Sequence, residues 1–248
     1  MAVSDSHPVS IDRAAEARTR ILEAALKEFS AHGLAGARTE AIAATAGVNK
    51  ALLYYYFAGK ETLYAAALEL AAGRVRDISL AALNCDASPG ERLLRMALNH
   101  FDRILTQREF QSLMQQEMIR RHKGEPGNLS VLAERIFKPL HDRFKQIVEE
   151  GVASGELIDV DWLQMELAAL GANVFYFLSA PILRLTVGPD EPEPFSPESL
   201  AARRRVLVEF LGQAVFLNRK DGAAAAARVL AHSPMPELDG EFVFWGKE

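Results

Sequence analysis

Apolar residues recur at intervals of three and four along most of the chain, which is the spacing of a helix with one buried face. In the first such segment they are Ile21, Leu22, Ala25 and Phe29. No segment alternates apolar and polar residues as a half-buried strand does. Divided at its polar, Gly and Pro breaks, the pattern predicts helices at 12–33, 39–46, 50–57, 60–83, 89–106, 108–122, 128–150, 161–185 and 197–218. The predicted fold class is all-α.

Breaks in this pattern predict the domain organisation. The clearest is the polar stretch 84–90, which contains both Pro and Gly. We therefore expect a small domain at 15–75, a larger helical domain at 84–220 and a C-terminal tail at 221–248. The predicted helix 60–83 is long enough to join the two domains, so it is a candidate lever between them.

Two features of the larger domain and the tail leave alternatives open. Pro139 lies inside the predicted helix 128–150 and should kink or split it. The tail carries three late aromatic residues, Phe242, Phe244 and Trp245. It either packs on the body through these residues or stays loose.

Two short predicted helices joined by a glycine turn form the most informative segment. Gly47 can take the positive φ of a tight turn, and Asn49 then stands where a helix N-cap belongs. At about 100° per residue, Leu53 and Phe57 share the inward face of the second helix, and Tyr55 points away from it. Such a pair is a helix-turn-helix, whose second helix enters the major groove of DNA.

The same spacing continues through three predicted helices without a gap. The residues are Ile21, Leu22, Ala25, Phe29, Gly33, Thr39, Ile42, Ala43, Ala46, Gly47, Val48, Leu53, Tyr54, Tyr56, Phe57, Lys60 and Leu63. From about 18 to 63 the chain resembles the DNA-binding domain of the TetR family of bacterial transcription regulators, with its helix-turn-helix at about 38–57. Beyond this region the likeness rests on size and on the all-helical pattern.

The resemblance implies a set of DNA-contacting residues. Thr39, Tyr54 and Lys60 would hold the DNA backbone, and the base-facing residues would be Asn49, Lys50, Ala51, Leu52 and Tyr55. Tyrosine hydroxyls donate to phosphate oxygens and lysines neutralise them, so the residue types suit double-stranded operator DNA. Tyr56 is a further candidate, with packing inside the small domain as the alternative.

Two positions depart from the family pattern. Leu52 stands where a small hydroxyl residue is often found; it can contact a thymine methyl but cannot form a hydrogen bond. Arg38 stands where a small capping residue is usual, so Thr39 is expected to cap the helix instead. Both departures bear on the operator sequence rather than on the fold.

The charge of the chain affects how strongly we expect it to bind DNA more than whether we expect it to bind DNA. The net charge of −5 argues against a strongly basic nucleic-acid binder, and residues 1–65 carry seven basic and seven acidic side chains. Within 41–60, however, there are two lysines and no acidic residue. We therefore expect DNA affinity to fall only moderately with salt.

The predicted helices 161–185 and 197–218 carry apolar rows beside small residues. The rows are Trp162, Leu163, Leu167, Leu170, Val174 and Phe177 on the first helix, and Leu207, Phe210, Leu211, Ala214 and Leu217 on the second. The resemblance implies that these helices from two copies form a four-helix interface, and a symmetric operator needs two readers. The alternative is that they are core helices of one subunit.

The larger domain is also expected to hold a small apolar or amphipathic effector. Candidate lining residues are His100, Phe101, Ile104, Met114, Met118, Phe137, Phe144, Phe175 and Tyr176. Methionine and phenylalanine at helical spacing are equally typical of plain core. His100 is better explained as a partly buried structural histidine than as a metal ligand. The charged cluster Glu117, Arg120, Arg121 and His122 is expected to face solvent.

Other classes of protein find little support in the sequence. The nucleophile–base, HExxH, Walker A and GxGxxG motifs do not occur, and we predict neither enzymatic activity nor a cofactor or metal site. A single cysteine, Cys85, suits a reducing cytoplasm. The sequence contains no run of 18 apolar residues, so we expect no membrane partner. The preferred function is a ligand-responsive homodimeric repressor. The alternative is an all-helical ligand-binding protein or enzyme that retains the N-terminal fold.

Overall fold

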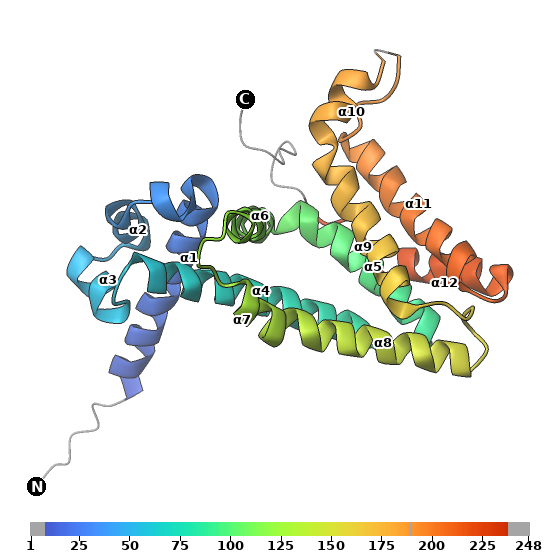
Figure 1. The fold of residues 1–248 in the computed structure, drawn as a ribbon, viewed down its shortest axis with the longest axis horizontal. Helices are drawn as coiled ribbons and strands as arrows, with labels where there is room; N and C mark the ends of the chain where they lie inside the picture. Colours follow the sequence, from blue (N-terminus) through green and yellow to red (C-terminus); the bar gives the residue numbers. More distant parts are fainter. Residues whose placement is uncertain (1–7, 189, 238–248) are drawn as a thin grey trace, which may run out of the picture. The chain divides into compact units, whose positions relative to one another are not determined.

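The computed structural model describes residues 8–188 and 190–237, and their regular structure is entirely helical (Figure 1). In order, the helices are α1 Pro8–Gly36, α2 Thr39–Ala46, α3 Lys50–Tyr56, α4 Lys60–Leu83, α5 Pro89–Thr106, α6 Arg108–His122, α7 Leu129–Leu132, the π-helical turn η1 Ala133–Phe137, α8 Lys138–Ala153, α9 Trp162–Leu178, α10 Ala180–Thr186, α11 Pro197–Val215 and α12 Arg219–Ala231. The all-α prediction is confirmed.

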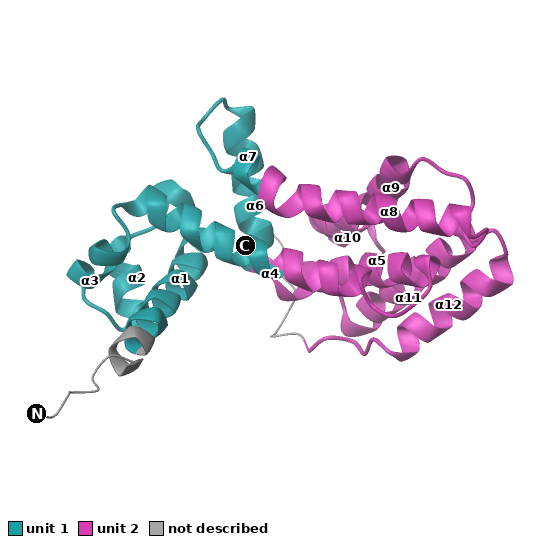
Figure 2. Ribbon diagram, turned by 90° about the horizontal axis from the view of Figure 1, so that it is seen from below, with its two compact units in different colours: residues 1–74, 109–132 teal, residues 75–108, 133–248 magenta. Residues whose placement is uncertain are grey.

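The chain divides into two compact units (Figure 2). Unit 1 is Met1–Arg74 with Glu109–Leu132, and unit 2 is Val75–Arg108 with Ala133–Glu248. Helix α4 therefore belongs to unit 1 over its first part and to unit 2 over its last. The predicted functional domains at 15–75 and 84–220 remain a prediction, since compactness groups α6 with the N-terminal helices.

Unit 1 is built on the apolar stripe of α1. Ile21, Ala25 and Phe29 are fully buried, and the ring of Phe29 meets that of Tyr64 on α4 edge to face at 5.1 Å. Gly33 was the expected limit of the first helix. It has a φ of 67°, and the chain continues beyond this kink to Gly36. Helix α6 is tied to the same stripe because Ser112 Oγ donates to the carbonyl of Ser30 at 2.8 Å.

Glu117 corrects the expectation that the charged cluster on α6 faces solvent. Its carboxylate is fully buried, where it accepts from Arg120 Nη1 at 2.9 Å and from the backbone N–H of Asn128. Arg121 and His122 do face solvent. A buried carboxylate needs such donors to offset its desolvation. Here they also fix the loop after α6 onto the helix.

Unit 2 is organised around α5, whose buried face packs against α8, α9, α11 and α12. One apolar cluster joins α5 to α8 and α12 through residues such as Leu94, Phe144 and Val229. A second cluster joins α5 to α9 and α11 through Phe101, Phe177 and Leu207. The core therefore surrounds α5 on several sides.

Proline divides both of the long helices predicted for unit 2. The predicted helix 128–150 is divided into α7, η1 and α8. Pro139 lies in the first turn of α8, which agrees with the expectation that it would kink or split the helix. The single helix predicted at 161–185 is wrong. It is α9 and α10, bent by 60° at Ser179, because Pro181 in the first turn of α10 has no N–H to continue the ladder.

The stretch 219–231 corrects the prediction of a tail from 221. It forms α12, in which Ala225, Ala226 and Val229 are fully buried. Helix α12 can lie close to α11 because Gly212 and Gly222 meet: a Cβ on Gly222 would come within 1.9 Å of the Gly212 carbonyl oxygen. The predicted helix 197–218 accordingly ends at Val215. Phe242, Phe244 and Trp245 lie outside the described residues.

The length and apolar character of the described helices bear on whether one of them could cross a membrane. No individual helix among them combines the length and apolar character needed to cross a bilayer. The bent pair α9 and α10 reaches that length and apolar character only when its two helices are taken together.

Candidate functional site

The turn between α2 and α3 has the predicted geometry. Gly47 adopts the left-handed conformation with a φ of 66°, and its N–H caps the end of α2. The side chain of Asn49 accepts from the backbone N–H of Leu52 at 2.8 Å, so the predicted N-cap is confirmed. Leu53 and Phe57 are buried, which anchors the inner face of α3 in unit 1.

The tyrosines divide by their position around α3. Tyr55 is 81% exposed and Tyr54 is 43% exposed, whereas Tyr56 is partly buried. The rings of Tyr55 and Tyr56 meet edge to face at 5.3 Å, which restrains both. The outer edge of α3 therefore presents aromatic hydroxyls to solvent, while Ala51 and Leu52 line its first turn, with Ala51 exposed and Leu52 partly buried.

Thr39 does not cap α2, contrary to expectation. Helix α2 begins at Thr39, and the N-cap residue is Arg38, whose side chain makes no capping hydrogen bond. The backbone N–H of Arg38 donates instead to Glu28 Oε1 at 3.0 Å. Thr39 is buried, and its hydroxyl lies 3.3 Å from the hydroxyl of Tyr54, so it orients that tyrosine across the helix pair.

Both candidate lysines are held by partners within unit 1. Lys50 forms an ion pair with Glu40 and lies 5.8 Å from the centre of the Tyr54 ring. The hydrogen bond from Lys50 lowers the pKa of Glu40, and the same contact raises the pKa of Lys50. Lys60 Nζ donates to the carbonyl of Ala35 at 2.9 Å. The nine predicted DNA-contacting residues all lie on α2, on α3 with its N-cap Asn49, and at the start of α4.

The predicted effector-lining residues do not gather in one place. Phe101, Ile104 and Tyr176 belong to or pack against the apolar cluster between α5, α9 and α11. Phe144 lies in the other cluster of unit 2, and Met114 is buried on α6 of unit 1. The outliers are Met118 at 59% and Phe175 at 69% exposure, with Phe137 partly buried at the end of η1.

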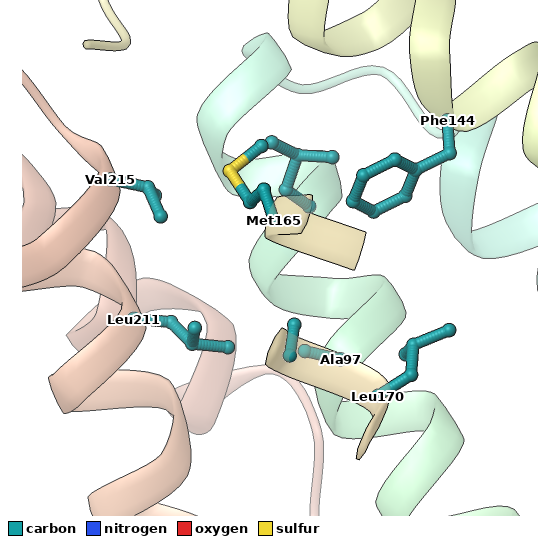
Figure 3. Close-up of a pocket in the computed structure, with 8 residues that line it drawn as sticks. Ala97, Phe144, Met165, Leu170, Leu211 and Val215 are labelled. Atoms are coloured by element: carbon teal, nitrogen blue, oxygen red, sulfur yellow. The ribbon is translucent and has the colours of Figure 1, made fainter. Parts of the chain in front are cut away.

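A small apolar hollow, partly open to solvent, lies between α5, α8, α9 and α11 (Figure 3). Its lining is Leu93, Ala97, Phe144, Met165, Ala169, Leu170, Leu211 and Val215. Among the predicted lining residues, only Phe144 contributes. The other residues that line the hollow are mostly small or aliphatic and recur at the spacing of any core helix. No local sequence signal distinguishes them from plain core.

His100 occupies the turn of α5 that follows Ala97. Its Nδ1 lies 3.3 Å from the side-chain nitrogen of Asn173, which also donates to the carbonyl of Ala97 at 3.0 Å. Burial, and to a smaller extent the charge of Arg103, lowers the pKa of His100 to about 3. The imidazole is therefore neutral at pH 7, and the described residues contain no group of side chains that could hold a metal ion with it.

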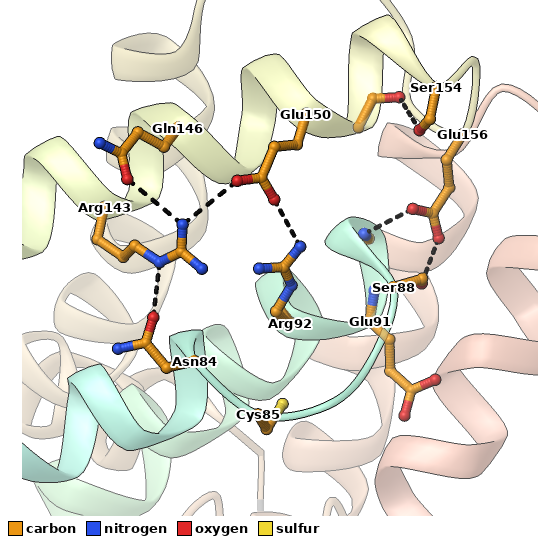
Figure 4. A network of polar contacts seen from close by, with 12 residues as sticks. Asn84, Cys85, Ser88, Glu91, Arg92, Arg143, Gln146, Glu150, Ser154 and Glu156 are labelled. Atoms are coloured by element: carbon orange, nitrogen blue, oxygen red, sulfur yellow. Dashed lines mark hydrogen bonds and ion pairs between the residues drawn. The ribbon is translucent and has the colours of Figure 1, made fainter.

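The end of α4 that lies in unit 2 is fastened to its neighbours by polar contacts (Figure 4). Asn84 accepts from Arg143 Nε of α8 at 2.7 Å. At the start of α5, Ser88 donates to Glu156 and the N–H of Gly90 donates to the same carboxylate at 3.0 Å. These contacts couple the turn after α4 to α8 and to the loop that follows it.

An exposed apolar face runs along α9, α10 and α11. Its members are Leu163, Leu167, Val174, Phe175, Leu178, Ile182, Leu185, Val206 and Phe210, with Leu217 just after α11. Of the predicted interface rows, Trp162, Leu170, Phe177, Leu207 and Leu211 instead pack against the core of the same subunit. Each helix therefore uses one side for the core and leaves another open.

Comparisons with known proteins agree with this arrangement. Residues 21–67 match the profile of bacterial regulatory proteins of the tetR family, and residues 89–211 match a tetracyclin repressor-like C-terminal domain. The HTH-type transcriptional repressor NicS of Pseudomonas putida is 31% identical over 150 residues, which are 59% of this chain and 68% of NicS.

Two further likenesses differ in their reach. The HTH-type transcriptional repressor SCO4008 of Streptomyces coelicolor is 52% identical over 52 residues, but these are 21% of this chain and 27% of that protein. The structure of the ketosteroid transcriptional regulator KstR2 of Mycobacterium tuberculosis has a TM-score of 0.58 and 20% identity, covering 81% of this chain and 95% of that one. This structural likeness shows the fold. Together with the two profiles and the extent of the NicS match, it leads to one conclusion: the chain belongs to the TetR family of bacterial transcription regulators.

Proposed function

We propose that this regulator represses transcription as a homodimer that a small effector releases from its operator. The observation that carries the proposal is the outer edge of α3, where Tyr55 is 81% exposed on a helix otherwise anchored by Leu53 and Phe57. A large aromatic side chain held outward on a rigid helix is suited to contact with a partner. In the TetR fold that partner is the major groove of DNA.

The proposed DNA contacts follow from the positions of the side chains. Tyr55, Ala51 and Leu52 approach base edges, and Leu52 offers only apolar contact to a thymine methyl. Tyr54, oriented by Thr39, donates to a phosphate oxygen. The side chain of Asn49 is committed to its cap, so its main contribution is to fix the start of α3.

The two lysines have to exchange partners on binding. Lys50 leaves Glu40 and Lys60 leaves the carbonyl of Ala35 when each turns to a phosphate. Both contacts are at the surface, where such pairs contribute little stability, so the exchange is cheap. Tyr56 packs against Tyr55 and supports it.

Dimerisation is proposed through the exposed apolar face of α9, α10 and α11. Phe175 and Phe210, at 69% and 68% exposure, would be its most prominent residues. Burying such a face against a second copy removes apolar area from water. Two copies would then hold two α3 helices at a fixed separation, as a symmetric operator requires.

The effector is proposed to act from unit 2 through α4. A ligand that enters among α5, α8, α9 and α11 displaces α8 or the loop after it, and these elements are fastened to the turn after α4 by Arg143 and Glu156. Because α4 continues into unit 1, its displacement would alter the separation of the two α3 helices. By linkage, effector and operator must weaken each other by the same factor.

We expect the protein to act in the cytoplasm. A gel-shift titration with purified protein tests its proposed function. The DNA upstream of the protein's own gene should be retarded specifically, and a cell extract or small-molecule set should contain a component that releases it. Replacing Tyr55 by Ala should abolish the shift while helicity and dimerisation persist. Binding that is salt-sensitive but blind to sequence would contradict operator recognition.

A further inference from the structure

Two arginines in unit 2 are almost equally buried but differently neutralised. Arg204 on α11 is 6% exposed and forms a two-point ion pair with Asp102, with both N–O distances at 2.8 Å. It also donates to the carbonyl of Pro234 at 3.0 Å. Arg103 on α5 is 5% exposed, and its Nε donates only to the amide oxygen of Asn99 at 3.0 Å.

Among the described residues, Arg103 is therefore a buried cation without an anion. In the part of the chain that the structure describes, no carboxylate comes within ion-pair distance of its guanidinium. Burying an uncompensated charge costs several kcal/mol, so proteins normally pair it. Asp102, the residue before Arg103 on α5, pairs with Arg204 instead. The buried charge of Arg204 is thus neutralised within the protein, as expected of an arginine with a structural role. An anion from outside the chain would supply what Arg103 lacks.

The neighbouring histidine offers a hydrogen-bond donor beside this charge. Asn173 is fully buried and directs its side-chain nitrogen at both the Ala97 carbonyl and His100 Nδ1. Since a carbonyl can only accept, the amide nitrogen must face Ala97. His100 Nδ1 then accepts, and the imidazole proton lies on Nε2. Arg103 follows one helical turn later on α5.

We propose that Arg103 and His100 form a binding site for a carboxylate, and that the effector of this regulator is an organic acid. The guanidinium pairs with the carboxylate and His100 Nε2–H donates to it. The acid's hydrocarbon part has apolar side chains nearby, because Ala97, whose carbonyl anchors Asn173, also lines the small apolar hollow between α5, α8, α9 and α11. The role of this acid as the effector rests on the proposed function, whereas its binding to Arg103 and His100 does not.

The test measures thermal unfolding of the full-length protein without DNA, at pH 7 and constant ionic strength. Octanoate serves as the probe and octanamide, equal in length but uncharged, as its control. Octanoate should raise the Tm of the wild type saturably, and octanamide should not match it. Arg103→Met should weaken the octanoate response at least tenfold in concentration. An equal response to both probes, or an unchanged response in R103M, overturns the proposal.

The paired arginine provides a matched control that needs no ligand. Removing an uncompensated cation should leave the Tm of unliganded R103M equal to or above that of the wild type. Arg204→Met should lower it, because Asp102 loses its partner. A Tm of R103M as low as that of R204M would show that Arg103 is neutralised within the protein, and would contradict the site.

A spectroscopic readout tests the role of Asn173 as a positioning residue. In the wild type, proton–nitrogen spectra should show His100 protonated on Nε2 alone. Asn173→Ala removes the donor to Nδ1, so a mixture of tautomers should appear together with weaker octanoate binding. A single unchanged tautomer would refute the positioning role. If octanoate binds through Arg103 but leaves operator affinity unchanged, the site stands and the effector role fails.

Discussion

Replacing Gly222 by Ala tests whether α12 is an integral part of unit 2. The added Cβ would lie 1.9 Å from the carbonyl oxygen of Gly212 and 3.0 Å from Cβ of Phe216. The first of these contacts is with backbone, so no change of rotamer can relieve it. Helix α12 would have to retreat from α11 by roughly 1.5 Å to restore ordinary contact.

The cost of this retreat follows from what α12 buries. Overpacking of this kind costs about 1–3 kcal/mol, and Ala225, Ala226 and Val229, all fully buried, would lose part of their packing as well. The better helix propensity of Ala over Gly returns about 1 kcal/mol. We expect a net destabilisation of about 2 kcal/mol, which lowers the Tm by about 4–8 °C for a domain of this size.

Calorimetry of the wild type and the variant measures the effect. Gly73→Ala is the matched control, because Gly73 also lies inside a helix but a Cβ there would meet nothing within 4 Å. G73A should stabilise by up to about 1 kcal/mol, so the same substitution gives opposite signs at the two sites. If G222A unfolds at the wild-type temperature, the close crossing of α11 and α12 does not occur.

Four further changes test other parts of the structure. Glu117→Gln removes the buried partner of Arg120 and should destabilise the protein by about 3 kcal/mol in urea unfolding; an unchanged midpoint would mean that the carboxylate is not buried. Glu40→Gln frees Lys50, so DNA affinity should rise severalfold and the salt slope should steepen by about one, both visible by fluorescence anisotropy. Phe210→Asp should yield monomers in sedimentation equilibrium, and a persistent dimer would place the interface elsewhere. His100 takes up a proton below about pH 6.5 in the unfolded chain but only near pH 3 in the folded chain. The free energy of unfolding should therefore decrease by up to about 1.4 kcal/mol per pH unit as the pH is lowered from 6.5 to 3, and His100→Gln should flatten that slope.

The local geometry of the DNA-binding helices was open to prediction because short-range rules determine it. Helical periodicity alone placed Leu53 inside and Tyr55 outside, and the turn residue Gly47 and the cap Asn49 followed from their backbone chemistry. The roles of these side chains on DNA remain a prediction.

Features that depend on distant partners were not predictable in the same way. An Ala-rich stretch resembles a solvated tail until Gly212 and Gly222 allow it to lie on α11. Glu117 looks like a surface acid because its burial depends on the backbone N–H of Asn128 in the following loop. Pro181 could equally have kinked one helix or begun another, since proline is tolerated in a first helical turn.

The lining of the apolar hollow is a further feature that could not be predicted from the sequence. Its lining comes mainly from Leu, Ala and Val on α5, α9 and α11, at spacings that any core helix would show. Aromatic residues were predicted to line a ligand site, yet Phe175 is exposed and Phe101 packs in a buried apolar cluster. Which apolar residues enclose a hollow depends on how the helices meet, and that information is not local.

The central claim is that two outward edges of α3, held by one homodimer, read a symmetric DNA site. Selection of binding sites from random duplex DNA tests it most directly, with the wild type and Tyr55→Ala compared on the selected sequence. We predict an inverted repeat whose half-sites lie about one helical turn, or a multiple of it, apart, and at least tenfold weaker binding by the dimeric variant. Recovery of no symmetric sequence, or equal affinity of Y55A for it, would contradict the claim.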